Sequence, residues 1–415
     1  MLPGPVAVTT ILSSRIEPPR GLKPAAHGFS GCSNHRAGRA PSMPHEYFVI
    51  DAFSGEAFGG NPAAVVLDAD DLSDERMKAI AAEFNLSETT FVLSPESGGE
   101  SNSGAPFEAG LSETTLLGCA ERGVTALARD ELHRGGDEVS DSPEGGVATR
   151  TTVATSTRAA ARPSTTTRVR FRWFTPSVEV RMCGHASVAA VRAMLECGRI
   201  RVDDSTASTV IEIETLSGLL RAYLERIPGR TDDAGYMIWL DLPRPSLAVV
   251  SRGVEELIAC LRIGRDDIEP AQPLRRTTDD DLLLFVRDAA ALHGITPDHL
   301  RLKELMVGQG VRGVGVATVK THSPAIHVQS RFFAPASGID EDPVTGSLHG
   351  PLAACLAERG LVEFHDGLGA ITCVQSKVGS RSGVLHALVQ RHDGGGYDVR
   401  IGGQAVTVMR GWLHA

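Results

Sequence analysis

The chain has 415 residues, of which 42% are hydrophobic, so it can bury a substantial core and is long enough for two or three domains. Its net charge of −10 argues against a nucleic-acid partner, because phosphate binding requires a basic patch. No apolar run reaches the roughly 18 to 20 residues of a membrane-spanning helix, so we expect no membrane role.

The cysteines indicate a reduced compartment. There are seven of them, an odd number, and they are widely spaced without a C-x-x-C pair or a matching histidine cluster. This pattern argues against a disulfide framework and against a zinc site. We therefore expect a cytoplasmic protein without a bound metal, in which most thiols are small buried apolar groups.

Residues 1–42 differ in composition from the rest of the chain. They are rich in Pro, Ser, Gly and Ala and carry five basic residues against one acid. Two interpretations stay open, an organellar transit peptide and a disordered leader upstream of a natural start at Met43.

The first expected domain, residues 43–232, alternates strands with helices. Apolar periodicity and turn residues place strands and helices as follows: strands at Tyr47–Phe53 and Ala63–Leu67, a helix at Asp74–Phe84, strands at Phe91–Leu93 and Val169–Thr175, and a helix that opens at Cys183–Ser187 and continues to Cys197.

A low-complexity insertion at residues 96–168 interrupts this domain. It is dominated by Ser, Thr, Gly, Ala and Arg, cannot build a core, and is expected to be mostly disordered. The pentapeptide Leu86–Thr90 recurs inside it as Leu111–Thr115, but only the first copy leads into a strand-like segment. A positioned carboxylate needs a rigid scaffold, so the candidate is Glu88 and Glu113 is expected to be inert.

The second expected domain, residues 233–415, repeats the plan of the first. Its expected elements are strands at Met237–Leu242, Leu282–Val286, Gly313–Lys320 and Gln329–Ala334, a Thr345–Ser347 turn, and a helix over His349–Arg359. Each half therefore places a glycine turn at the start of a central helix. The repetition predicts two pseudo-symmetric domains that face a shared cleft.

The segment Asp340–Ser347, DEDPVTGS, has the features of a small-anion site. A helix that begins at Thr-Gly-Ser presents free N–H groups and the positive end of its dipole. Asp342 is placed to hold a polar group of the same ligand, whereas Asp340 and Glu341 are expected to be solvated. The G-x-G-x-x-G match at 308–313 leads into a strand rather than a helix, so we expect no dinucleotide cofactor.

Four motifs in consistent order resemble the PhzF family, the phenazine biosynthesis-like proteins with the diaminopimelate epimerase fold. Outside the leader and the insertion, the resemblance extends from Tyr47 to Leu413. It implies an α+β fold of two pseudo-symmetric epimerase-like domains, each a mixed sheet wrapped around a central helix, with the active site in the cleft between them. The motifs are FGGNPAAVV (58–66), FNLSETTFV (84–92), FTPSVEVRMCGHAS (174–187) and SRFFAPASGIDEDPVTGS (330–347).

The resemblance implies a cofactor-independent isomerase in which one carboxylate removes a proton from carbon and returns it elsewhere on the same face. The family's general acid/base falls on Glu88, its active-site histidine on His185, its aspartate on Asp342 and its serine on Ser347. Backbone N–H groups at Gly184–His185 and Gly346–Ser347 would grip a substrate carboxylate.

Other interpretations remain open at this stage. The same fold could serve as a catalytically silent binding or regulatory protein, or as a cysteine-type racemase that uses Cys183. The racemase is disfavoured because the second helix start has Thr345 where a second thiol would be needed. Asn61 is assigned to its Asn-Pro turn and not to the catalytic set. The expected partner is a small carboxylate whose identity the sequence does not reveal, and a homodimer stays open.

Overall fold

The structure is a computed structural model that describes residues 44–96, 166–202, 209–227, 230, 235–321, 323, 326–377 and 379–414. The leader and nearly all of the insertion, including Glu113, lie outside these residues, so the expectations for them stay predictions. Within the described ranges, no helix has both the length and the apolar character needed to cross a bilayer.

The first half of the described chain forms a mixed sheet around one helix. Its elements are β1 (His45–Ala52), β2 (Asn61–Val66), α1 (Asp74–Phe84), β3 (Thr89–Leu93), β4 (Thr167–Phe174), β5 (Glu179–Val180), α4 (Gly184–Glu196), β6 (Thr209–Thr215) and β7 (Gly218–Arg226). Strand β4 begins two residues before the expected strand start, so Thr167 and Arg168 belong to the sheet and not to the insertion.

The second half contains more strands than the sequence analysis anticipated. Its elements are β8 (Tyr236–Asp241), β9 (Leu247–Val249), α5 (Val254–Leu261), β10 (Arg275–Thr277), β11 (Leu282–Phe285), α6 (Ala289–His293), α7 (His299–Gln309), β12 (Val314–Thr318), β13 (Val328–Ala334), β14 (Ile339–Asp342), α8 (Gly346–Glu358), β15 (Phe364–His365), β16 (Leu368–Ser376), β17 (Ser382–Arg391), β18 (Tyr397–Gly403) and β19 (Ala405–Leu413). The helix α8 begins three residues earlier than expected.

The two halves repeat one order of strand pairing. In the first, β2 and β3 are parallel, β3 and β4 antiparallel, β4 and β6 parallel, and β6 and β7 antiparallel. In the second, β11 and β12 are parallel, β12 and β13 antiparallel, β13 and β16 parallel, and β16 and β17 antiparallel. The connection between β4 and β6 contains α4, and the connection between β13 and β16 contains α8. The repeat is the pseudo-symmetry that the glycine turns indicated.

Strands also cross between the halves. The last strand, β19, pairs antiparallel with β1 along its length, and β8 pairs with both β7 and β18. The sheet of the first half is therefore completed by the end of the chain, beyond the expected domain boundary at residue 232. This exchange of strands fixes the two halves against each other.

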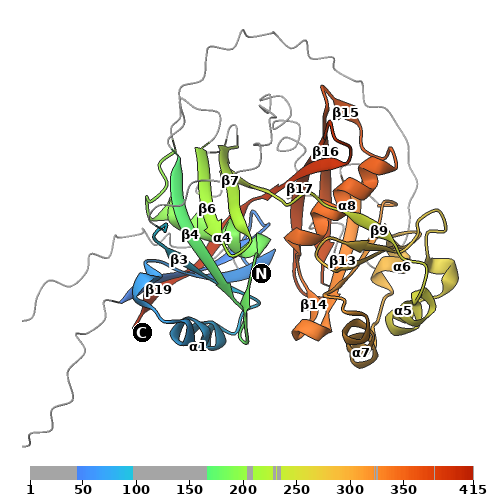
Figure 1. Ribbon diagram of the computed structural model, residues 1–415, viewed down its shortest axis with the longest axis horizontal. Helices are drawn as coiled ribbons and strands as arrows, with labels where there is room; N and C mark the ends of the chain where they lie inside the picture. The colour runs from blue at the N-terminus through green and yellow to red at the C-terminus, as the bar shows by residue number, and fades with distance from the viewer. Residues whose placement is uncertain are drawn as a thin grey trace, which may run out of the picture. The chain divides into compact units, whose positions relative to one another are not determined.

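The central helices α4 and α8 each lie against the sheet of their own half (Figure 1). Residues Gly184–Met194 of α4 are all buried, and α8 is almost entirely buried from Gly346 to Ala357. A helix that is apolar or small on every face is stable only when surrounded. Helix α4 contacts β1 and β2, and α8 contacts β17 and β18. The α+β fold with one central helix in each half is thus confirmed.

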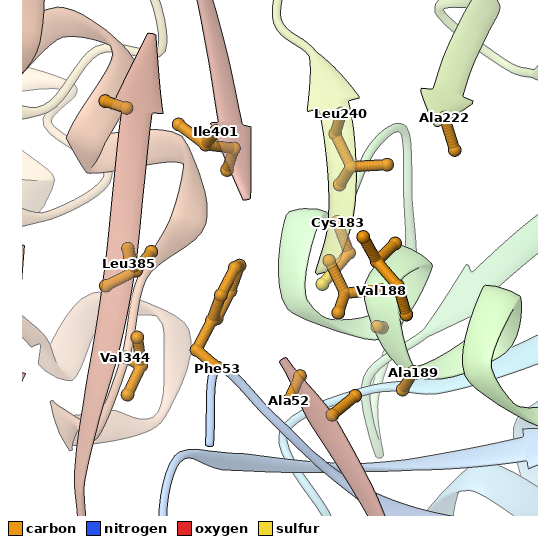
Figure 2. Close-up of a cluster of buried hydrophobic side chains, with 14 of the residues drawn as sticks. Ala52, Phe53, Cys183, Val188, Ala189, Ala222, Leu240, Val344, Leu385 and Ile401 are labelled. Atoms are coloured by element: carbon orange, nitrogen blue, oxygen red, sulfur yellow. The ribbon is translucent and has the colours of Figure 1, made fainter. Parts of the chain in front are cut away.

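One hydrophobic cluster runs through both halves. In Figure 2, the fully buried ring of Phe53 lies between Cys183 and Val188 on one side and Val344 and Leu385 on the other. Because this contact lies beside the starts of both central helices, the core holds the two helix starts in a fixed relation.

Candidate active site

The N-termini of α4 and α8 meet in the centre of the molecule. A Cβ atom added to Gly184 would lie 3.5 Å from the Cα atom of Gly346. Both helices begin after an extended N-cap residue, Cys183 in α4 and Thr345 in α8. The first N–H groups of a helix have no partner within it, and the dipole adds positive potential there. Two such ends side by side favour a small anion.

Glu88 approaches this point from the segment just before β3. Its Oε2 atom lies 3.3 Å from Nε2 of His185, and the Glu88 side chain is only 15% exposed. Burial raises the pKa of Glu88, opposed by a hydrogen bond with Ser87 and by the charge of Arg312. A carboxyl group with a raised pKa can both accept and return a proton near neutral pH.

His185 connects Glu88 with the start of α4. Its Nδ1 atom lies 3.4 Å from the Cys183 Sγ atom, and its Nε2 atom lies 3.3 Å from the Ser87 Oγ atom. Burial lowers the pKa of His185, so the ring is neutral near pH 7. Burial likewise raises the pKa of the Cys183 thiol, which therefore stays protonated in this state.

Asp342 lies at the end of β14 and is held by side chains from both halves. Its Oδ1 atom accepts a 2.9 Å hydrogen bond from Asn61 Nδ2, and its Oδ2 atom accepts a 2.5 Å bond from the Thr345 hydroxyl. Burial, the largest influence, raises the pKa of Asp342 to about 6. Asn61, which its sequence context assigns only to an Asn-Pro turn, positions Asp342 through its side-chain amide, and this amide also donates to the Val344 carbonyl.

Replacing Asp342 with asparagine should remove a pH dependence of stability. The folded protein holds the Asp342 proton more tightly than the unfolded chain, so the stability that protonated Asp342 contributes is lost as the pH rises from about 4 through about 6. The loss is about 2 to 3 kcal/mol, at about 1.4 kcal/mol per pKa unit. The free energy of unfolding of Asp342→Asn, measured in urea relative to that of the wild type, should be higher at about pH 7 than at about pH 4 by this amount. An identical pH dependence in both proteins would contradict the assignment.

Ser347 is held by an arginine that the sequence analysis overlooked. Its Oγ atom accepts a 2.8 Å hydrogen bond from Arg312 Nη2, and Arg312 in turn forms a two-pronged ion pair with the buried Asp281. Arg312 lies in the segment whose G-x-G-x-x-G match was set aside. No local pattern reveals its role, because its two partners lie more than thirty residues away in the chain.

One neighbour of Asp342 was wrongly expected to be solvated. Glu341 is largely buried and forms a two-pronged ion pair with Arg331, at 2.7 and 3.0 Å. Asp340, by contrast, is exposed as expected. The alternation of strand β14 turns Asp340 outward, and the following acid meets an arginine on the adjacent strand β13.

A small pocket opens beside Ser347. Met182, which precedes α4, lines it together with Ser347 and Pro351 of α8 and with Leu242, which follows β8. Residues from both halves therefore form its wall. The site residues expected from the sequence (Glu88, Gly184, His185, Asp342, Gly346 and Ser347) all lie around the two helix starts.

Comparisons with known proteins agree in their coverage of the chain. A sequence model of the family described as "Phenazine biosynthesis-like protein" (PhzC-PhzF) matches residues 50–103 and 136–411. An uncharacterized isomerase of Pseudomonas aeruginosa is 31% identical over 370 residues, which cover 88% of this chain and 98% of that protein. The uncharacterized isomerase YddE of Salmonella typhimurium is 28% identical over 374 residues, covering 88% of this chain and 97% of the relative.

Solved structures show the same fold. The PhzF-family phenazine biosynthesis protein of Bacillus anthracis has a TM-score of 0.63 at 20% identity and covers 90% of this chain and 99% of its own. A PhzF-family protein of Enterococcus faecalis has a TM-score of 0.55 at 23% identity, covering 90% of this chain and all of its own. At these identities the likeness establishes the architecture only.

Proposed function

Because the chain belongs to the PhzC-PhzF family of phenazine biosynthesis-like proteins and is an isomerase, we propose that it moves a proton within a small carboxylate-bearing metabolite without a cofactor. Glu88 is the general acid/base of this reaction. The observation that carries the proposal is the meeting of two helix N-termini at the point where Glu88, His185 and Asp342 converge.

The proposed reaction begins when the Glu88 carboxylate takes a proton from carbon next to the substrate carboxylate. Negative charge then develops on the substrate carboxylate, where N–H groups of Gly184, His185, Gly346 and Ser347 stabilise it. Glu88 returns the same proton to another carbon on the same face. His185, whose Nε2 atom lies 3.3 Å from Glu88 Oε2, contacts the substrate together with Asp342 and orients it against Glu88.

A cysteine-type exchange would need a second thiol across the substrate from Cys183. Thr345 occupies the corresponding N-cap of α8, and its hydroxyl donates to Asp342 instead of facing the substrate as a base. This contact supports the one-carboxylate reaction over the two-thiol reaction.

A methyl group between the helix starts should weaken substrate binding. In Gly184→Ala the new Cβ atom would lie 3.5 Å from Gly346 Cα, an ordinary van der Waals contact that the fold tolerates. The methyl group would nevertheless occupy the proposed carboxylate site, so we expect KM to rise about 10-fold or more, equivalent to about 1.4 kcal/mol. Gly308→Ala in α7 meets open space and is the matched control. An unchanged KM in Gly184→Ala would argue against carboxylate binding between the helices.

Solvent exchange tests the proposed function directly. Purified full-length protein is incubated in heavy water with a panel of cyclic and amino-acid carboxylates, and deuterium in recovered carbon positions is measured by mass spectrometry. We expect deuterium to enter a carbon position of at least one isomerised compound. A compound that binds tightly without exchange or isomerisation would instead support a silent binding protein.

A further inference from the structure

Three groups that can bind a metal converge inside the candidate active site. Glu88, Cys183 and His185 each present one ligand atom, and these atoms all lie within 4.8 Å of one another. Two separations are shorter, 3.3 Å from Glu88 Oε2 to His185 Nε2 and 3.4 Å from Cys183 Sγ to His185 Nδ1. It is the one such cluster of three His, Cys, Asp or Glu groups in the described part of the chain.

The donor set matches the preferences of zinc. Carboxylate oxygen, thiolate sulfur and imidazole nitrogen bind Zn²⁺ at about 2.0 to 2.3 Å, which places tetrahedral ligand atoms roughly 3.3 to 3.8 Å apart. The two short separations already lie in this range. A metal uses only one of the two ring nitrogens of His185, so the third ligand has to approach by about 1 Å.

A second observation also points to a cation. Glu88 Oε2 is buried and lies 3.3 Å from His185 Nε2, but it accepts no hydrogen bond of good geometry from the described residues. Burying an unpartnered carboxylate oxygen is unfavourable, and a bound cation would satisfy it. Asp342 adds a further carboxylate whose charge acts on the same thiol, whereas the charge of Arg312 and the positive ends of the α4 and α8 dipoles oppose a cation.

We propose that Glu88, Cys183 and His185 form a binding site for a thiophilic divalent cation such as Zn²⁺, and that the bound cation switches the enzyme off. As the Zn–S bond forms, the Cys183 thiol proton leaves to solvent, and water completes the coordination. The binding rests on the cluster alone, whereas the inhibition rests on the proposed function. While both residues are ligands, Glu88 cannot transfer the proton and His185 cannot orient the substrate. The sequence analysis expected no zinc site, because Glu88 lies 95 residues from Cys183 and no ligand spacing in the chain reveals the cluster.

Cobalt titration tests the site without requiring a known substrate. Full-length protein is stripped with EDTA, dialysed and titrated with CoCl2, because thiolate ligation of Co²⁺ produces a near-ultraviolet charge-transfer band. We expect this band in the wild type, its displacement by ZnCl2, and its absence in Cys183→Ser. Glu88→Gln removes a charged ligand, so it should lower the Co²⁺ affinity by at least the roughly 10- to 100-fold that loss of an outer-shell partner causes. Cys373→Ser, a buried thiol outside the cluster, should keep the band, as should Cys32→Ser and Cys119→Ser.

The absence of a thiolate band in the wild type, or its persistence in Cys183→Ser, would overturn the metal site. Should Cys183→Ser fail to fold, Glu88→Gln decides, because an unchanged Co²⁺ affinity would overturn the site equally. The outcome of the heavy-water experiment is independent of the outcome of the cobalt titration. Deuterium exchange without a cobalt band refutes the metal site alone, whereas a cobalt band without exchange supports the metal site and refutes the proposed isomerisation.

Discussion

Glu88→Gln is expected to abolish solvent deuterium entry into substrate while leaving the protein folded. Glutamine keeps the shape of the side chain but can neither accept nor return the proton. General acid/base groups contribute about 10² to 10⁴ in rate, so we expect the exchange rate to fall by at least that factor. Burial already disfavours the Glu88 carboxylate, so the neutral amide should not lower the melting temperature. Exchange in heavy water and thermal melts measure the two effects separately.

The chain provides a matched control for this substitution. Glu113 stands in a second Leu-Ser-Glu-Thr-Thr pentapeptide, so Glu113→Gln makes the same chemical change in the same five-residue context. We expect the control to exchange deuterium at the wild-type rate. Glu88 would lose its assigned role if both variants behaved alike, or if Glu88→Gln lost exchange only because it no longer folded.

The sequence predicted the features that depend on local pattern. Glycine turns at Gly184 and Gly346 indicated the two helix starts, because each turn is followed by a run of small and apolar residues that is typical of a buried helix. The strand that follows the pentapeptide Leu86–Thr90 indicated that Glu88, and not Glu113, is the positioned carboxylate. These local signals, together with the order of four motifs, were enough to indicate both the architecture and the residues around the site.

Contacts between distant segments were not predictable in the same way. Asn61 donates to Asp342 across 281 residues, and β19 pairs with β1 from opposite ends of the chain. Neither pairing has a sequence signature, because the polar groups of each segment find their partners only after the chain has folded and the sheet has closed. The turn before Asn61 shows the same limit. A Cβ atom on Gly60 would lie 2.0 Å from the Ala52 carbonyl oxygen, a close approach that glycine-rich sequence alone does not specify.

The ion pair beside Asp342 predicts the largest effect on stability. Arg331 is only 3% exposed and donates to both Glu341 oxygens and to the carbonyls of Leu292, at 3.1 Å, and Ile295, at 2.8 Å. Arg331→Met would leave the Glu341 carboxylate and two carbonyl oxygens without these donors. Removing one partner of a buried ion pair is strongly destabilising, so we expect the free energy of unfolding to fall by about 3 to 5 kcal/mol.

Urea unfolding of three variants isolates the origin of that loss. Arg287→Met removes a half-exposed arginine that pairs with Asp267 and Asp288, and should change stability by no more than about 1 kcal/mol. Adding Glu341→Met to Arg331→Met removes the stranded carboxylate and should recover part of the loss. A loss in Arg331→Met no larger than in Arg287→Met would show that the pair is not what fixes β14. Strand β14 ends at Asp342. If the ion pair does not fix β14, it also does not explain how the Asp342 carboxyl group is held at the helix starts.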